Sequence, residues 1–97
     1  MANWEATLLN GVLSTGTVLV LARDRLDASE VPKLRMADTF YGSAPDGNPF
    51  GGTVVEMHGD RAVVEVNQKR HPMHKAQDHE ANHDFKVDLP HEYWVLD

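Results

Sequence analysis

The hydrophobic and polar positions of the chain alternate most regularly between Gly52 and Asn67. Two β-branched runs flank Gly59-Asp60, and a glycine at the first position of a two-residue loop is typical of a tight hairpin turn. On the second arm Ala62, Val64 and Val66 share one face, as period two requires for a strand with one side on the core. This stretch therefore predicts a β-hairpin.

Strand formers near the N-terminus predict a second hairpin, although two positions for its turn are open. Thr17 to Ala22 is short, β-branched and apolar on both faces, which predicts a buried strand. One arrangement turns at Asn10-Gly11, where both residues tolerate positive φ. The alternative turns at Ser14-Thr15-Gly16 and pairs Thr7–Leu13 with Val18–Leu21.

The segments that follow have weaker patterns. Residues 23–40 fit either a short helix capped at Ser29 or, as we favour, a loop that leads to a strand at Lys33–Thr39. Tyr41 to Gly52 contains four glycines and two prolines. This composition predicts a long loop with a turn at Pro45-Asp46-Gly47.

The C-terminal third begins with a polar stretch, Asn67 to Asp84, which predicts a loop or a short helix around His74–His83. Phe85–Leu89 alternates as a strand, and Glu92–Leu96 predicts a final edge strand. The expected fold is β-rich, an all-β small barrel or an α+β roll, with five or six strands and at most one or two short helices. A chain of 97 residues has room for one core, so we expect residues 1–97 to form a single domain.

Charge narrows the classes of partner. The net charge is −6, and Gln77 to Asp97 holds six acidic residues against one basic residue, Lys86. Such an acidic end favours a protein partner with a basic surface and argues against direct binding to a nucleic-acid backbone. The absence of cysteine excludes disulfides and thiolate catalysis. The longest apolar run, Val18–Ala22, is too short for a membrane helix, so we expect a cytoplasmic location and no membrane partner.

The function that this layout favours is a small acidic protein-binding module, such as an inhibitor, an adaptor or an assembly component, in preference to an enzyme. Adjacent residues of a strand point to opposite faces, so either Tyr93 or Trp94 can serve as an anchor while the other packs in the core. The Gly/Pro-rich loop offers a second contact region. The candidate partner-binding residues are Asp46, Phe50, Asp88, Glu92, Tyr93, Trp94 and Asp97.

Histidines supply an alternative function. Four of the six cluster between positions 71 and 83. The segment from His79 to His83 has the His-Glu-x-x-His form, and so resembles the motif of the zinc metallopeptidases. The resemblance implies a divalent metal such as zinc on both imidazoles, with Glu80 as general base and a third ligand from His71, His74 or His91. This alternative is a metal-binding protein or a zinc-dependent hydrolase; surface histidines with no cofactor are the interpretation that we prefer.

A further alternative comes from the hairpin. Gly52 to Asn67, followed by His71-Pro72-Met73, resembles the flap of the bacterial FKBP-type prolyl isomerases that also act as chaperones. Those proteins continue after the hairpin with Asn-His-Pro-Leu-Ala-Gly, whereas Gln68-Lys69-Arg70 intervene here. The resemblance implies a flap-type peptide-binding chaperone module.

Overall fold

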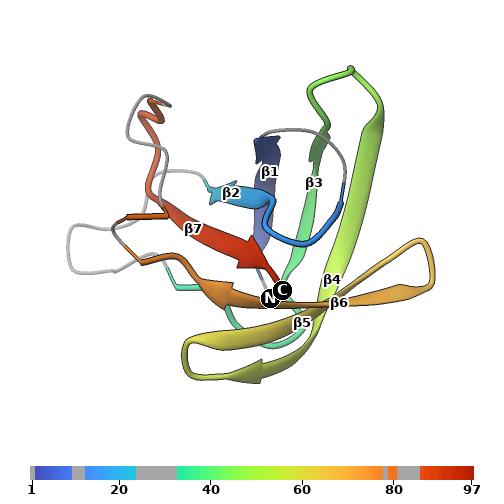
Figure 1. The fold of residues 1–97 in the computed structure, drawn as a ribbon, viewed down its shortest axis with the longest axis vertical. Helices are drawn as coiled ribbons and strands as arrows, with labels where there is room; N and C mark the ends of the chain where they lie inside the picture. The colour runs from blue at the N-terminus through green and yellow to red at the C-terminus, as the bar shows by residue number, and fades with distance from the viewer. Residues whose placement is uncertain (1, 10–12, 24–32, 78, 81–85) are drawn as a thin grey trace.

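The chain folds into a closed β-barrel (Figure 1). The computed structural model describes residues 2–9, 13–23, 33–77, 79–80 and 86–97. Seven strands in these ranges follow one another around the barrel in the order β1-β2-β7-β6-β5-β4-β3. They are β1 Asn3–Leu9, β2 Val18–Ala22, β3 Thr39–Ser43, β4 Pro49–His58, β5 Arg61–Val66, β6 Lys69–Lys75 and β7 His91–Leu96. The β-rich class is confirmed, with seven strands in place of the five or six expected. The described ranges contain no helix, and hence none that could cross a bilayer.

The predicted hairpin between Gly52 and Asn67 is present as β4 and β5. Val54 pairs with Val64, and Met57 pairs with Ala62, on either side of a turn at Gly59-Asp60. Gly59 has a φ of +63°, a conformation that glycine adopts without steric cost. Val54 and Val64 are both fully buried, so the alternation of the sequence correctly identified the face that packs in the core.

At the N-terminus β1 pairs with β2, with Leu9 directly opposite Val18. The two-residue turn at Asn10-Gly11 is therefore wrong, because the connection extends to Val18; residues 10–12 lie outside the described ranges. The alternative, which paired Thr7–Leu13 with Val18–Leu21, named the correct partner strand for β1. β2 is buried on both faces, as predicted. Its inward side chains Leu19 and Leu21 join the main core, while Val18 and Val20 belong to a second cluster with Leu9 and Val95.

A parallel pair, β1 with β3, closes the barrel. Gly42 of β3 lies opposite Ala6, and a Cβ added at Gly42 would come within 1.6 Å of the Ala6 carbonyl oxygen. The two backbones can approach this closely only because position 42 has no side chain.

The long loop predicted for Tyr41–Gly52 is wrong, because most of these residues belong to β3 and β4. Only the central turn is confirmed, with the Gly47 amide donating to the Ala44 carbonyl at 2.9 Å. The glycines that suggested a loop serve packing instead. A Cβ at Gly52 would lie 2.4 Å from the ring of Phe40, so glycine leaves room for that ring inside the barrel.

The strand predicted at Lys33–Thr39 is also wrong. Lys33 to Asp38 is irregular and includes a turn at Met36-Ala37, where Ala37 has a φ of 70°. The buried Asp38 carboxylate accepts hydrogen bonds from the amides of Ala2 and Arg35 and from Trp4 Nε1. These bonds fix the turn at one end of the barrel, and the strand β3 begins only after it. The alternative helix capped at Ser29 falls outside the described residues.

The polar stretch after Asn67 also forms a strand where we expected a loop or a helix. Asn67 and Gln68 both have positive φ and make a two-residue turn, after which β6 pairs with β5. Lys86–Leu89 is not a strand, and Phe85 lies outside the described ranges. The final strand is confirmed as β7, but it is not an edge, because it pairs with both β2 and β6.

Candidate functional site

The structure separates the candidate partner-binding residues into core and surface positions. Trp94 and Glu92 point inward from β7 and are 1% and 6% exposed. Phe50 is also buried, where its ring meets that of Phe40 edge-on at 6.3 Å. Trp94 is therefore a core residue, and it cannot serve as the surface anchor that the sequence offered as one of two readings. Its side chain lies on the inward face of β7.

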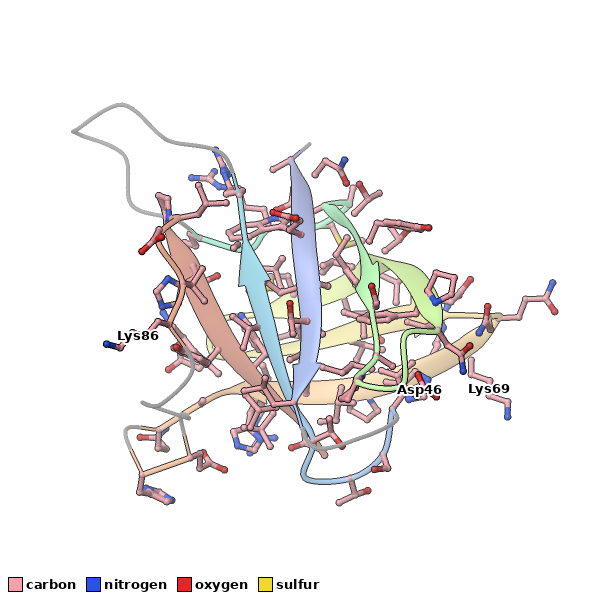
Figure 2. The ribbon with its side chains drawn as sticks, turned by 90° about the horizontal axis from the view of Figure 1, so that it is seen from above. Asp46, Lys69 and Lys86 are labelled. Atoms are coloured by element: carbon pink, nitrogen blue, oxygen red, sulfur yellow. The ribbon has the colours of Figure 1, made fainter. Side chains whose placement is uncertain are left out.

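The remaining candidates do not gather on one surface. Tyr93 is half-buried on the outer side of β7, where its ring packs edge-on against His91 at 5.1 Å. Asp88 and Asp46 are exposed. Figure 2 shows Asp46 on the opposite side of the barrel from Lys86, which lies two residues before Asp88 in the chain. A single contact surface cannot include both aspartates.

The acidic end of the chain is partly neutralised by its own basic neighbours. Glu92 Oε2 lies 3.1 Å from Lys75 Nζ, and Asp97 Oδ2 lies 3.5 Å from Arg61 Nη1. Asp97 also contacts His74 through its other oxygen, at 2.6 Å from Nδ1. The acidic excess in the sequence thus overstates the free negative charge that this end of the chain presents.

Each ring nitrogen of His74 is within hydrogen-bond distance of a different carboxylate. Nδ1 faces Asp97, and Nε2 lies 3.1 Å from both oxygens of Glu80; we call these three residues the His74 cluster. Hydrogen bonds to Asp97 and then to Glu80 raise the pKa of His74 above its ordinary value of 6.5. The hydrogen bond from the Gln77 amide lowers the pKa of Glu80, and the hydrogen bond with His74 lowers it further by a smaller amount. Both nitrogens must carry a proton to donate to two carboxylates, so the geometry suits an imidazolium.

The arrangement around Glu80 differs from the predicted metal site. Glu80 turns toward His74, and His79 is exposed. Because the two nitrogens of an imidazole point in opposite directions, the carboxylates of the His74 cluster cannot converge on one ion. Among the described residues no group of three or more histidines, aspartates or glutamates could hold a metal. His83 lies outside those residues, and His79-Glu80 forms a turn.

A surface built on β1 and β3 was not predicted from the sequence. Tyr41 is 64% exposed and pairs across the strands with Glu5, which is exposed as well. Glu5 lies between two hollows of about 250 and 330 Å³, because it lines both of them. The first also contains Asn3 and Arg23, and the second reaches Asp88. We call Tyr41, Glu5 and the two hollows the Tyr41 face.

The position of Tyr41 explains why sequence reasoning overlooked it. The residue lies in a stretch whose glycines and prolines suggested a loop, so no face could be assigned to it. Only the pairing of β3 with β1 places it next to Glu5, 36 positions earlier in the chain. The alternation of Phe40 inward and Tyr41 outward was the available signal.

Comparison with known proteins gives no relative: no family model, no curated protein and no solved structure matches the chain. The resemblances to zinc metallopeptidases and to the isomerase flap thus stay predictions from short segments. In the structure the flap-like hairpin is part of the barrel wall, and His71-Pro72-Met73 lies within β6.

Proposed function

We propose that the chain is a protein-binding module that uses the Tyr41 face to contact a partner with basic side chains on its surface. The observation that carries this proposal is the exposure of Tyr41. The tryptophans are buried in the core, whereas Tyr41 leaves its ring in solvent. Tyrosine is enriched at protein interfaces because its ring contributes apolar contact and its hydroxyl forms a hydrogen bond.

The surroundings of Tyr41 support the same function. One hollow borders the Tyr41 ring and the second lies beyond Glu5, so partner side chains have places to pack beside the ring. Shape complementarity of this kind excludes water around an anchor. The hollows are shallow surface features of a few hundred Å³, which suits side chains of a protein better than an enclosed substrate.

Charge supports a basic partner. Glu5 has no ion pair with any described residue, so a basic side chain arriving beside Tyr41 meets a free carboxylate. The net charge of −6 adds long-range attraction to a basic surface. Lys86 and Arg23 also line the hollows and repel a basic side chain, so the contact between such a side chain and this face must be made at Glu5. We place this function in the cytoplasm as part of the proposal.

The test is a comparison of variants in capture experiments. Immobilised wild-type protein and the variants Tyr41→Ser, Glu5→Gln and Asp46→Asn are exposed to an extract of the cells that make the protein. Glu5→Gln and Asp46→Asn remove the same charge, but only the first lies on the Tyr41 face. We expect one basic protein to be retained by wild type and Asp46→Asn, reduced by Glu5→Gln and lost with Tyr41→Ser. Equal capture by all four forms would reject the Tyr41 face.

A further inference from the structure

One end of the barrel opens into a cleft of about 240 Å³. We call it the barrel mouth; Lys33, Met57, Asp60, Lys75, Glu92 and Trp94 line it. Glu92 and Trp94 are two residues apart in β7, so both side chains lie on its inward face. Lys75 of β6 lies directly opposite Trp94. Lys33 comes from the segment before β3, and Asp60 comes from the β4–β5 turn.

An ion pair forms one wall of the barrel mouth. Glu92 Oε1 accepts a hydrogen bond from the Leu34 amide at 2.7 Å, and Oε2 lies 3.1 Å from Lys75 Nζ. Both oxygens of this buried carboxylate are therefore engaged. An ammonium group has three N–H donors, and Glu92 is the one partner that the Lys75 ammonium has among the described residues. Lys75 thus keeps donors for a ligand.

The two tryptophans of the core differ in one respect. Trp4 Nε1 donates to Asp38 at 3.0 Å, whereas the buried Nε1 of Trp94 has no hydrogen-bond partner within the described part of the chain. Buried donors without a partner are uncommon in folded proteins. Because Trp94 lines the cleft, a ligand there could supply the missing acceptor once neighbouring side chains shift to uncover the N–H.

We propose that the barrel mouth binds a small organic molecule through a carboxylate, which accepts hydrogen bonds from Lys75 and Trp94 and faces Lys33 at the rim. Among the described residues the Lys33 ammonium and the Trp94 indole N–H have no partner, and the Lys75 ammonium has one. The mouth already holds two carboxylates, those of Glu92 and Asp60, besides its two ammonium groups, so a singly charged ligand is favoured over a doubly charged phosphate. The volume lies below the roughly 300 Å³ at which sites for drug-sized ligands begin, which suits a small acid.

The proposal can be tested by NMR on the uniformly ¹⁵N-labelled full chain. The two indole N–H signals are assigned with Trp94→Phe, and acetate, propionate or succinate is then added at constant ionic strength. We expect the Trp94 signal to shift saturably while the Trp4 signal stays fixed. Lys33→Ala should weaken binding a few-fold, as for other partly exposed ion pairs, and Lys69→Ala at the distant β5–β6 turn should leave it unchanged.

Three results would overturn the proposal. The first is a Trp94 signal that stays in place up to about 50 mM of every carboxylate, beyond the range of weak specific binding. The second is a linear drift of both indole signals, reproduced by chloride. The third is a stronger saturable shift with inorganic phosphate than with any carboxylate. None of these results bears on the Tyr41 face, which lies elsewhere on the barrel.

Discussion

Val64 shows how a single residue position follows from the alternation of the sequence. It lies on the inward face of β5, fully buried and directly opposite Val54. We expect Val64→Asp to unfold the protein. An unpaired charge in the core costs several kcal/mol, a large share of the roughly 5–15 kcal/mol that stabilises a domain.

Urea unfolding monitored by circular dichroism measures this effect. The matched control is Val63→Asp, which introduces the same group at the neighbouring, half-buried position of β5. The control should keep a cooperative transition with a smaller loss of stability. A wild-type midpoint for Val64→Asp would show that the register of the β4–β5 hairpin is wrong.

Single residues outside such regular alternation could not be assigned from the sequence. Tyr93 and Trp94 are neighbours in β7, and period two states only that they face opposite ways. Which of them points inward depends on the pairing of β7 with β2 and β6, and hence on residues about 20 and 75 positions away. Asp38 resembled an ordinary loop residue, although three N–H groups converge on its buried carboxylate.

At the scale of elements, the His74 cluster joins β6 to the end of β7 and to the turn that contains Glu80. Arg61 of β5 is the cross-strand neighbour of His74 and contacts Asp97, and His79 is the other charged group that acts on Glu80. The ion pairs of the His74 cluster should make the stability of the protein depend on pH. A raised folded-state pKa of His74 gives stability that is fully present below 6.5 and lost as pH rises through the folded-state pKa.

Glu80 acts in the opposite direction. Its lowered folded-state pKa gives stability that is present above 4.5 and lost as pH falls through the folded-state value. We therefore expect the largest contribution of the cluster between pH 4.5 and pH 6.5. Melting temperatures of wild type and His74→Gln should differ most in this range and converge in alkaline solution. His58→Gln, at an exposed position of β4 outside the cluster, is the control. A difference that persists unchanged above the folded-state pKa would rule out an imidazolium role.

The strands themselves were predictable where two β-branched runs adjoin a short turn, as in β4–β5. They were missed where glycine or charge masked the pattern. Gly51 and Gly52 lie inside β4, where small size makes space for neighbouring rings. β6 carries basic and histidine residues because its outward face is in solvent, and Met73 is its one fully buried side chain. In both places the local composition suggested a loop. These residues form strands because they pair with other strands of the barrel, and composition alone does not reveal that pairing.

At the scale of the whole molecule, a β-rich barrel followed from the number of short strands, but closure did not. Closure depends on the parallel pairing of β1 with β3, two strands separated in the chain by β2 and its connections. Likewise the net charge could be read from the sequence, whereas its internal pairing with Lys75, Arg61 and His74 could not. The free carboxylate and exposed ring of the Tyr41 face emerge only after closure.

The most direct test of the Tyr41 face is the binding kinetics of the captured partner at several ionic strengths. Association should slow as salt shortens the screening length below about 10 Å, and Glu5→Gln should slow it further than Asp46→Asn does. Tyr41→Ser should accelerate dissociation at least about tenfold, because a packed aromatic anchor acts mainly on the off-rate. Association that ignores salt, together with a dissociation rate unchanged by Tyr41→Ser, would contradict the account.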